Sequence, residues 1–176
     1  KTVMPIWQYS KIYFQNLNKD NMAEVDTKNF YVAHYHEDEQ HINDLKTLMG
    51  DTYQIKNYSV TSDKFNNAHN EDYIKSLLRP LISKAGTFVC LIGENTHDSK
   101  WVDWEIREAA RQGKPIIGVF CLGAKDSDIP EALAELADSI VGWRKDKIEA
   151  AVEGKLSFEN ADGSPRSDVT VARGQC

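Results

Sequence analysis

The chain contains 176 residues, of which 41% are hydrophobic, and its formal net charge at pH 7 is −6. This length fits one domain with short extensions, and the apolar content is sufficient for a packed core, which excludes a fully disordered chain. The acidic excess excludes a general nucleic-acid binder, because such a protein needs a basic surface. The acidity is central, since residues 29–154 contain 14 basic and 21 acidic residues while both ends are nearly neutral.

Hydrophobic periodicity predicts strands and helices that alternate along the centre of the chain. Apolar runs predict strands at residues 30–34, 53–60, 86–93, 115–122 and 139–143. Apolar residues at helical spacing predict helices at residues 37–49, 71–84, 99–112, 130–137 and 144–152. Strands that alternate with helices form a parallel sheet, because each parallel pair needs a crossover connection.

The predicted fold is therefore α/β, a flavodoxin-like three-layer sandwich with a five-stranded parallel sheet, over residues 29–153. Residues 1–28 are predicted to be an N-terminal extension, and residues 154–176 a flexible, turn-rich C-terminal tail. In such sheets ligands bind at the carboxyl ends of the strands, near the point where the strand order reverses. Functional residues are therefore expected in the loops that follow His34, Val60, Gly93 and Leu122.

The three cysteines are widely separated, and Cys90 and Cys121 lie inside apolar runs. This pattern suits buried thiols in a reducing compartment and argues against a disulfide framework. No apolar run approaches the length of a membrane span, and the start of the chain does not resemble a signal peptide. We expect a soluble cytoplasmic protein that binds neither membrane nor nucleic acid.

Several common chemical motifs are missing from the sequence, including the phosphate-binding loop, the dinucleotide-binding glycine pattern and the hydrolase nucleophile elbow. A receiver domain is disfavoured because no aspartate follows the third predicted strand. The histidines His34, His36 and His41 gather near the end of the first strand, but their spacing does not match a helical zinc pair. Hydrogen-bonded structure or substrate contact is the favoured interpretation, and no metal or cofactor is predicted.

The most informative stretch runs from Leu91 to Ile106, where a buried strand ends and a helix begins at Asp98 or Ser99. On that helix Trp101, Glu105 and Glu108 share one stripe, beside a core stripe that contains Val102 and Ile106. A carboxylate near two tryptophans can be desolvated and lie next to a stacked planar ring. The alternative is that Trp101 packs on the sheet edge and Glu105 is an ordinary exposed helix acid.

This stretch resembles the TIR-like domain of Thoeris B proteins, the sensor enzymes of a bacterial anti-phage system. The signature of that family is a strand ending in L-I-G, a threonine three residues later, and then W-V-x-x-E-I at the start of a helix. The chain keeps each spacing, with Leu91-Ile92-Gly93, Thr96, Trp101-Val102 and Glu105-Ile106. The resemblance covers about residues 29–153 and is most specific over residues 88–120. Val32 departs from the small or hydroxyl residue often found in the first strand of TIR domains.

The resemblance implies a TIR-like enzyme that cleaves NAD+ at the nicotinamide–ribose bond and makes an ADP-ribose-derived signal. Glu105 then occupies the catalytic position of W-V-x-x-E-I, and NAD+ is a substrate, so no separate cofactor is implied. A single carboxylate can suffice, because nicotinamide is a good leaving group and the ribose becomes oxocarbenium-like. The predicted substrate-binding residues are Phe30, His34, Tyr35, Asp63, Lys64, Phe65, Asn95, Thr96 and Trp101.

The implied partners are a phage-derived trigger protein, an effector reached through the nucleotide signal, and further copies of the chain in a homo-oligomer. Two alternatives stay open at this point. A non-catalytic TIR-like scaffold or phage-sensing module would use the same fold without chemistry, and Val32 favours it. An enzyme similar to nucleoside deoxyribosyltransferases would share the fold and act on free nucleosides instead of NAD+.

Overall fold

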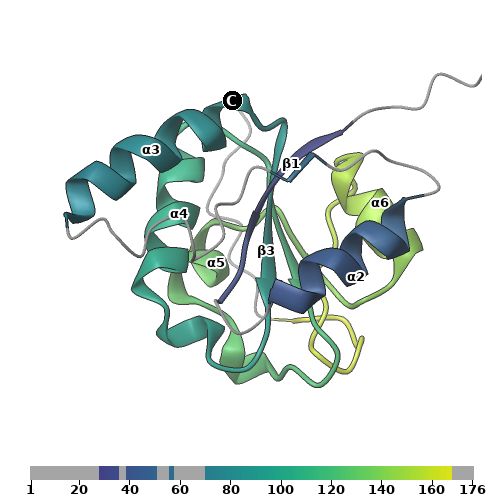
Figure 1. Cartoon of the computed structure of the whole chain (residues 1–176). Coiled ribbons are helices and arrows are strands. Elements are labelled where there is room, and N and C mark those ends of the chain that lie inside the picture. Colours follow the sequence, from purple (N-terminus) through teal and green to yellow (C-terminus); the bar gives the residue numbers. More distant parts are fainter. Residues whose placement is uncertain (1–27, 36–38, 51–55, 58–69, 168–176) are drawn as a thin grey trace, which may run out of the picture.

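A computed structural model of the chain describes residues 28–35, 39–50, 56–57 and 70–167 (Figure 1). At its centre is a five-stranded sheet in the order β2-β1-β3-β4-β5, and every neighbouring pair is parallel. The strands are β1 (Asn29–Ala33), β2 (Lys56–Asn57), β3 (Thr87–Ile92), β4 (Ile116–Phe120) and β5 (Ser139–Val141). The predicted α/β fold with a five-stranded parallel sheet is confirmed. Its strand order reverses between β1 and β3, which is where such folds bind ligands.

Helices cover both faces of the sheet and complete the three layers (Figure 1). The first face packs against α3 (Glu71–Lys84), α4 (Lys100–Arg111) and α5 (Glu131–Leu136), and the second against α2 (Glu39–Met49) and α6 (Lys145–Val152). Successive strand residues point to opposite faces. Tyr31 therefore lies in the core beneath α3 and α4, whereas Phe30 and Val32 lie in the core beneath α2 and α6.

Helix ends near the candidate site carry side-chain caps that the sequence indicates. Asn70 precedes α3, and its side-chain oxygen accepts a hydrogen bond from the amide of Asp72 at 2.9 Å. Ser99 precedes α4, and its hydroxyl accepts a hydrogen bond from the amide of Val102 at 3.3 Å. These bonds satisfy amides that the first helical turn leaves unpaired. The loops after β3 and β4 contain two short 3-10 helices that periodicity does not predict, η3 (Thr96–Asp98) and η4 (Asp126–Asp128).

Residues 155–167 pack beside β5, which differs from the flexible tail that composition predicts. The amide of Ile140 donates to the Ser157 carbonyl at 2.9 Å, and the amide of Glu159 donates to the Ile140 carbonyl at 2.8 Å. The Glu159 carboxylate is buried, accepts a hydrogen bond from the Gly142 amide at 3.0 Å and lies 2.6 Å from the Lys147 ammonium. The segment is rich in turn-forming residues, but it also contains the buried Glu159 and Phe158, which packs on the core. The rest of the tail, residues 168–176, and residues 1–27 lie outside the described residues.

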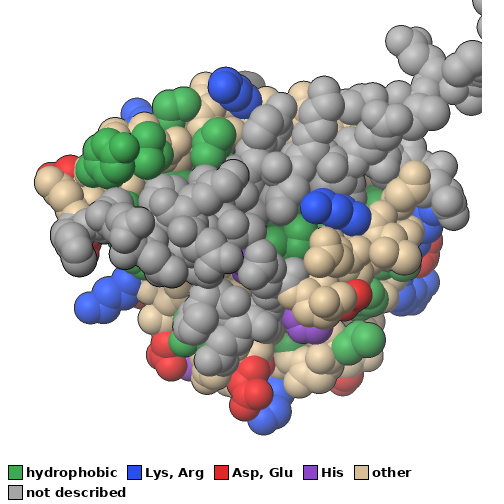
Figure 2. Space-filling view, viewed as in Figure 1, with side chains coloured by type: hydrophobic (Ala, Val, Ile, Leu, Met, Phe, Trp, Pro, Cys, Tyr) green, Lys and Arg blue, Asp and Glu red, His purple; other side chains and the backbone are tan. Residues whose placement is uncertain are grey.

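The described helices include none that combines the length and the apolar character needed to cross a bilayer. The side chains of Cys90 and Cys121 are buried, on opposite faces of the sheet. Hydrophobic side chains also gather on the surface over α3, where Figure 2 shows them as a green group. Two exposed apolar residues, Tyr73 and Leu77, belong to this helix and lie one turn apart.

Candidate functional site

Glu105 lies in the middle of α4, on the side that faces β1. The hydroxyl group of Tyr31 donates a hydrogen bond to Oε1 of Glu105. The Tyr31 side chain is fully buried and stacks on Phe88, with 5.4 Å between ring centroids and 10° between ring planes. Tyr31 and Phe88 are also register partners across the β1–β3 pair. The central sheet therefore holds the hydroxyl group that contacts Glu105.

The surroundings of Glu105 favour its neutral form. Burial raises the pKa of Glu105 from 4.5 to about 7, and the hydrogen bond from Tyr31 lowers that pKa in part. Within the described part of the chain, no salt bridge reaches this carboxyl group. Burial, followed by the charge and hydrogen bond of Glu105, raises the pKa of Tyr31 well above its usual value. Tyr31 is therefore a neutral donor at physiological pH, and Glu105 changes charge near neutrality.

Glu108, one turn further along α4, has the opposite surroundings. Its side chain is buried, Arg111 binds both of its oxygens at 2.5 and 3.0 Å, and Gln112 donates to Oε1 at 2.7 Å. Nε of Arg79 lies 3.8 Å from Oε2. The hydrogen bond from Arg111 is the largest of the effects that lower the pKa of Glu108. Although Glu108 shares the stripe of Trp101 and Glu105, its carboxylate is occupied by contacts with the end of α4 and with Arg79 of α3.

The two tryptophans of α4 contact each other and α3. Trp101 and Trp104 meet edge to face, with 6.2 Å between centroids. The Lys75 ammonium lies 5.9 Å from the Trp101 centroid and 5.8 Å from the Trp104 centroid, and the Arg79 guanidinium lies 5.7 Å from Trp104. Trp104 therefore packs within the α3–α4 contact. Trp101 keeps 37% of its surface exposed, one turn before Glu105.

Two predicted substrate-binding residues, Phe30 and Thr96, have fully buried side chains. Phe30 is fully buried on the opposite face of the sheet, because it alternates with Tyr31 along β1. Thr96 is also fully buried, and its hydroxyl accepts from the Gly93 amide at 2.8 Å and donates to the Gly93 carbonyl at 2.9 Å. Thr96 therefore shapes the loop after β3, and its side chain is not presented to a ligand.

The remaining predicted residues lie at the carboxyl end of the sheet or outside the described residues. His34 and Tyr35 are half-buried and follow β1 directly. Asn95 is exposed in the loop after β3 and takes a left-handed backbone conformation with φ of 67°. Asp63, Lys64 and Phe65 lie outside the described residues, and so does His36 of the histidine group. Where the chain is described, no three side chains of the metal-binding types gather as a metal site requires.

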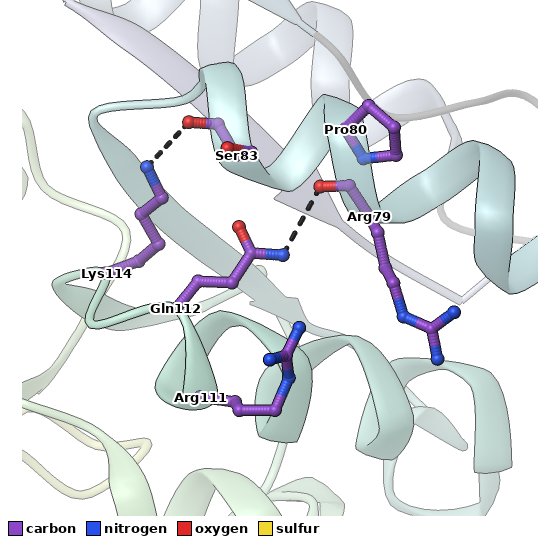
Figure 3. Close-up of a pocket in the computed structure, with 6 residues that line it drawn as sticks. All are labelled: Arg79, Pro80, Ser83, Arg111, Gln112 and Lys114. Carbon is purple, nitrogen blue, oxygen red and sulfur yellow. Dashed lines mark hydrogen bonds between the residues drawn. The ribbon is translucent and has the colours of Figure 1, made fainter.

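A cavity of about 500 Å³ lies at the amino end of the sheet, between α3 and the end of α4 (Figure 3). The Lys114 ammonium donates to the carbonyls of Ser83 at 2.8 Å and Ala85 at 2.7 Å, and the Gln112 amide donates to the Arg79 carbonyl at 3.3 Å. These bonds engage carbonyls in the last turns of α3, which supports a structural role for the cavity wall. None of the predicted substrate-binding residues lines this cavity. Its lining residues are Arg79, Pro80, Ser83, Arg111, Gln112 and Lys114.

Comparison with known protein families identifies the domain. The profile of the family described as Thoeris protein ThsB, TIR-like domain, matches residues 31–126, which is more than half of the chain. The chain belongs to this ThsB family. The match includes Tyr31, Glu105 and the whole stretch from Leu91 to Ile106, so the family resemblance predicted from that stretch is confirmed.

Solved structures with a similar shape have low sequence identity. A structure of the CMP N-glycosidase BcmB of Clostridium botulinum has 19% identity and a TM-score of 0.43, and the alignment covers 72% of this chain and 98% of that chain. A conserved protein from Enterococcus faecalis has 15% identity and a TM-score of 0.42, with 55% of this chain and 65% of that chain covered. A search of curated proteins finds no match.

The sequence prediction of the site in this ThsB-family chain omits Tyr31, the residue that contacts Glu105 directly. A signal for it exists in the sequence, because a tyrosine inside an apolar strand needs a hydrogen-bond partner when it is buried. The partner cannot be identified from the strand alone, since all residues of Phe30–Ala33 are buried and their pattern does not distinguish the two faces.

Proposed function

We propose that this chain is a TIR-like enzyme that cleaves NAD+ and makes an ADP-ribose-derived signal in anti-phage defence. The supporting observation is Glu105, a half-buried carboxyl group with a pKa of about 7, at the glutamate position of W-V-x-x-E-I within the family match. Strongly shifted pKa values that arise from burial are typical of reactive carboxyl groups. Glu108, three residues away, lacks this property, since arginines hold its pKa low.

The proposed reaction breaks the bond between the ribose C1′ atom and the nicotinamide nitrogen. The bonding electron pair goes to that nitrogen, so the cationic ring leaves as neutral nicotinamide without needing a proton. Positive charge then develops on the ribose, and the ionised Glu105 carboxylate stabilises it. An acceptor hydroxyl or water forms the new bond to C1′ and releases one proton. The acceptor determines whether the product is cyclic, conjugated or hydrolysed ADP-ribose.

A pKa near neutrality suits this role. With a pKa raised to about 7, both the neutral and the ionised form of Glu105 are accessible near neutral pH in the free protein. The pyridinium cation of NAD+ would favour the ionised form, because a nearby opposite charge lowers the pKa of a carboxyl group. Substrate binding would thereby generate the catalytic charge. Trp101, one turn away, is partly exposed, and His34 and Tyr35 follow the end of β1, so all three are proposed to contact the substrate.

The proposed setting follows the family resemblance. A phage-derived protein would trigger the enzyme, and the product would activate an effector, with NAD+ as substrate and no further cofactor. A homo-oligomer would form around the site. We place the reaction in the cytoplasm, where the buried thiols of Cys90 and Cys121 would stay reduced.

Mass spectrometry of NAD+ products tests the proposal. NAD+ is incubated with lysate from phage-infected cells that express the full chain, the Glu105→Gln variant, or the control Glu131→Gln, which changes an exposed glutamate on α5. Nicotinamide and an ADP-ribose derivative are expected from the wild type and the control, and neither from Glu105→Gln. Full activity of Glu105→Gln, or no nicotinamide from triggered wild type, would refute the proposal. Cleavage of free nucleosides in place of NAD+ would assign the chain to nucleoside chemistry.

A non-catalytic interaction module is the second candidate function. The exposed apolar residues Tyr73 and Leu77 on α3 favour it, because grouped apolar side chains at a surface often mark contact sites (Figure 2). Loss of anti-phage protection in Tyr73→Ser with Leu77→Ser, together with full protection in Glu105→Gln, would support this function over the enzyme.

A further inference from the structure

The position of the Tyr31 hydroxyl group is fixed by the packing of the central sheet. Tyr31 lies on a central strand, is fully buried, and stacks on Phe88 across the β1–β3 pair. The residues that surround its face of the sheet come from α3, α4 and β3, and include Ile82, Phe88 and Ile106. A buried aromatic ring packed in this way has little freedom to rotate. Glu105, in contrast, is half-buried on a helix, and its side chain has more rotatable bonds.

The hydrogen bond from Tyr31 makes the two carboxyl oxygens of Glu105 different from each other. Tyr31 donates to Oε1, and within the described residues no hydrogen bond reaches Oε2. A carboxylate can accept several hydrogen bonds, so the occupied Oε1 leaves capacity on the other oxygen. With Oε1 held by the sheet, the carboxyl plane is constrained and Oε2 is the oxygen left for a ligand.

We infer that Tyr31 is a positioning residue that orients the Glu105 carboxyl group through Oε1, so that Oε2 meets the ribose of the substrate. This inference deepens the proposed function and rests on it. Tyr31 acts through Glu105 and does not itself touch the substrate. The role requires the hydroxyl group and not only the ring, which separates it from simple core packing.

A second consequence concerns ionisation of the same carboxyl group. A hydrogen bond from a neutral donor stabilises the carboxylate and lowers its pKa, which opposes the effect of burial. Tyr31 cannot neutralise the carboxylate as an arginine would, so the negative charge remains available to a developing ribose cation. Removal of the hydroxyl group would raise the Glu105 pKa further, and less carboxylate would be present at neutral pH.

The test uses the full chain with its trigger and compares Tyr31→Phe with the wild type. Phenylalanine keeps the ring that stacks on Phe88 and removes only the oxygen. At pH 7, kcat is expected to fall by about tenfold or more, as for loss of a hydrogen bond to a charged group, while KM changes little. The low-pH limb of the activity profile is expected to move to higher pH, because more alkaline conditions are needed to ionise Glu105. The matched control is Thr47→Val, which removes an exposed hydroxyl group of α2, on the other face of the sheet.

Direct titration of the Glu105 carboxyl carbon by NMR gives a readout that does not need activity. The pKa of Glu105 is expected to be higher in Tyr31→Phe than in the wild type. A ring-fluorinated tyrosine at position 31 is a stronger donor of nearly the same shape, and it should lower that pKa and move the activity profile to lower pH. Opposite shifts from two well-folded variants would not arise from loosened packing.

The outcomes separate the two proposals. Unchanged kcat, pH profile and Glu105 titration in Tyr31→Phe would overturn the positioning role even if the wild type cleaves NAD+. An equal loss of activity at all pH values with an unchanged titration would also overturn it, because it would indicate packing alone. If triggered wild type releases no nicotinamide, the proposed function fails, and the NMR titration still decides whether Tyr31 controls the carboxyl group.

Discussion

Glu105 and Glu108 lie one turn apart on α4, yet their surroundings shift their pKa values in opposite directions. Glu105 has one neutral donor, Tyr31, and a pKa raised to about 7. Glu108 is held by Arg111 and Gln112, with Arg79 nearby, and its pKa is lowered. The contrast teaches that helix position does not determine the role of a carboxyl group. The groups placed around it do, because β1 supplies a phenol to Glu105, whereas Arg111 and Gln112 at the end of α4 bind Glu108 and Arg79 of α3 lies nearby.

The largest expected difference between the two glutamates is in activity. Glu105→Gln should reduce NAD+ cleavage by about a thousandfold, comparable to loss of a main electrostatic contact to the transition state. Glu108→Gln should stay within a few-fold of the wild type, since its contacts are structural. Nicotinamide release by the triggered proteins, measured well below both melting temperatures, checks this. Equal losses of activity in the two variants would show that Glu105 and Glu108 do not differ in function.

Stability should respond in the reverse order. Glu108→Gln replaces a buried carboxylate and leaves Arg111 and Arg79 without their partner. Both arginines are about half exposed or more, so water can compensate them in part, and a loss of about 2 kcal/mol in the free energy of unfolding is expected. Urea denaturation at pH 7 measures it. The control is Glu135→Gln, which breaks an exposed pair with Arg107 and should cost less than about 1 kcal/mol.

The pH dependence of stability should have opposite signs at the two positions. The folded-state pKa of Glu105 is raised from 4.5 to about 7. Its favourable contribution to the free energy of unfolding is therefore complete below pH 4.5 and is lost as pH rises through 7. Glutamine stays neutral, so Glu105→Gln should be more stable than the wild type at pH 8 by about 2 kcal/mol, with a smaller difference at pH 4. For Glu108 the lowered pKa predicts the reverse, since its contribution is lost as pH falls. Melting temperatures of both variants, measured from pH 4 to pH 8 and compared with the wild type, check this prediction. Stability differences that change with pH in the same direction for both variants would contradict it.

The smallest expected effect concerns Lys75, which lies over the two tryptophans and, unlike Arg79, contacts neither glutamate. Lys75→Met keeps the aliphatic stem and removes the charge, so it should cost about 0.5–1 kcal/mol through lost cation–π contact. Tryptophan fluorescence during urea denaturation measures this change. The control Glu71→Gln removes the exposed ion-pair partner of Lys75. A loss as large in the control as in Lys75→Met would assign the effect to that pair.

Much of the fold was predictable because its signals are local. The caps Asn70 and Ser99 and the apolar run of β3 each indicate an element without knowledge of its neighbours. The site was predictable only in part. Glu105 is found through the W-V-x-x-E-I resemblance, whereas its partner Tyr31 depends on which face of β1 meets α4. A strand buried on both faces carries no alternation from which that face can be read.

The burial of the predicted substrate-binding residues Phe30 and Thr96 has related physical causes. Phe30 adjoins Tyr31 in sequence, but the side chains of neighbouring strand residues point to opposite faces of the sheet. Thr96 follows the L-I-G pattern at the expected spacing, but a hydroxyl side chain can bond its local backbone, as it does with Gly93. Spacing alone therefore places a residue near a site without showing where its side chain points.

The segment Ser157–Glu159 has a consequence for how the sheet can grow. It pairs with Ile140 along the outer side of β5, so the hydrogen-bonding groups at that position are already occupied. An extended peptide from another molecule cannot add there as a sixth strand without first displacing this segment and the buried Glu159–Lys147 contact. Strand addition is thereby blocked at Ile140, and assembly through this part of the molecule has to use side chains in place of backbone pairing.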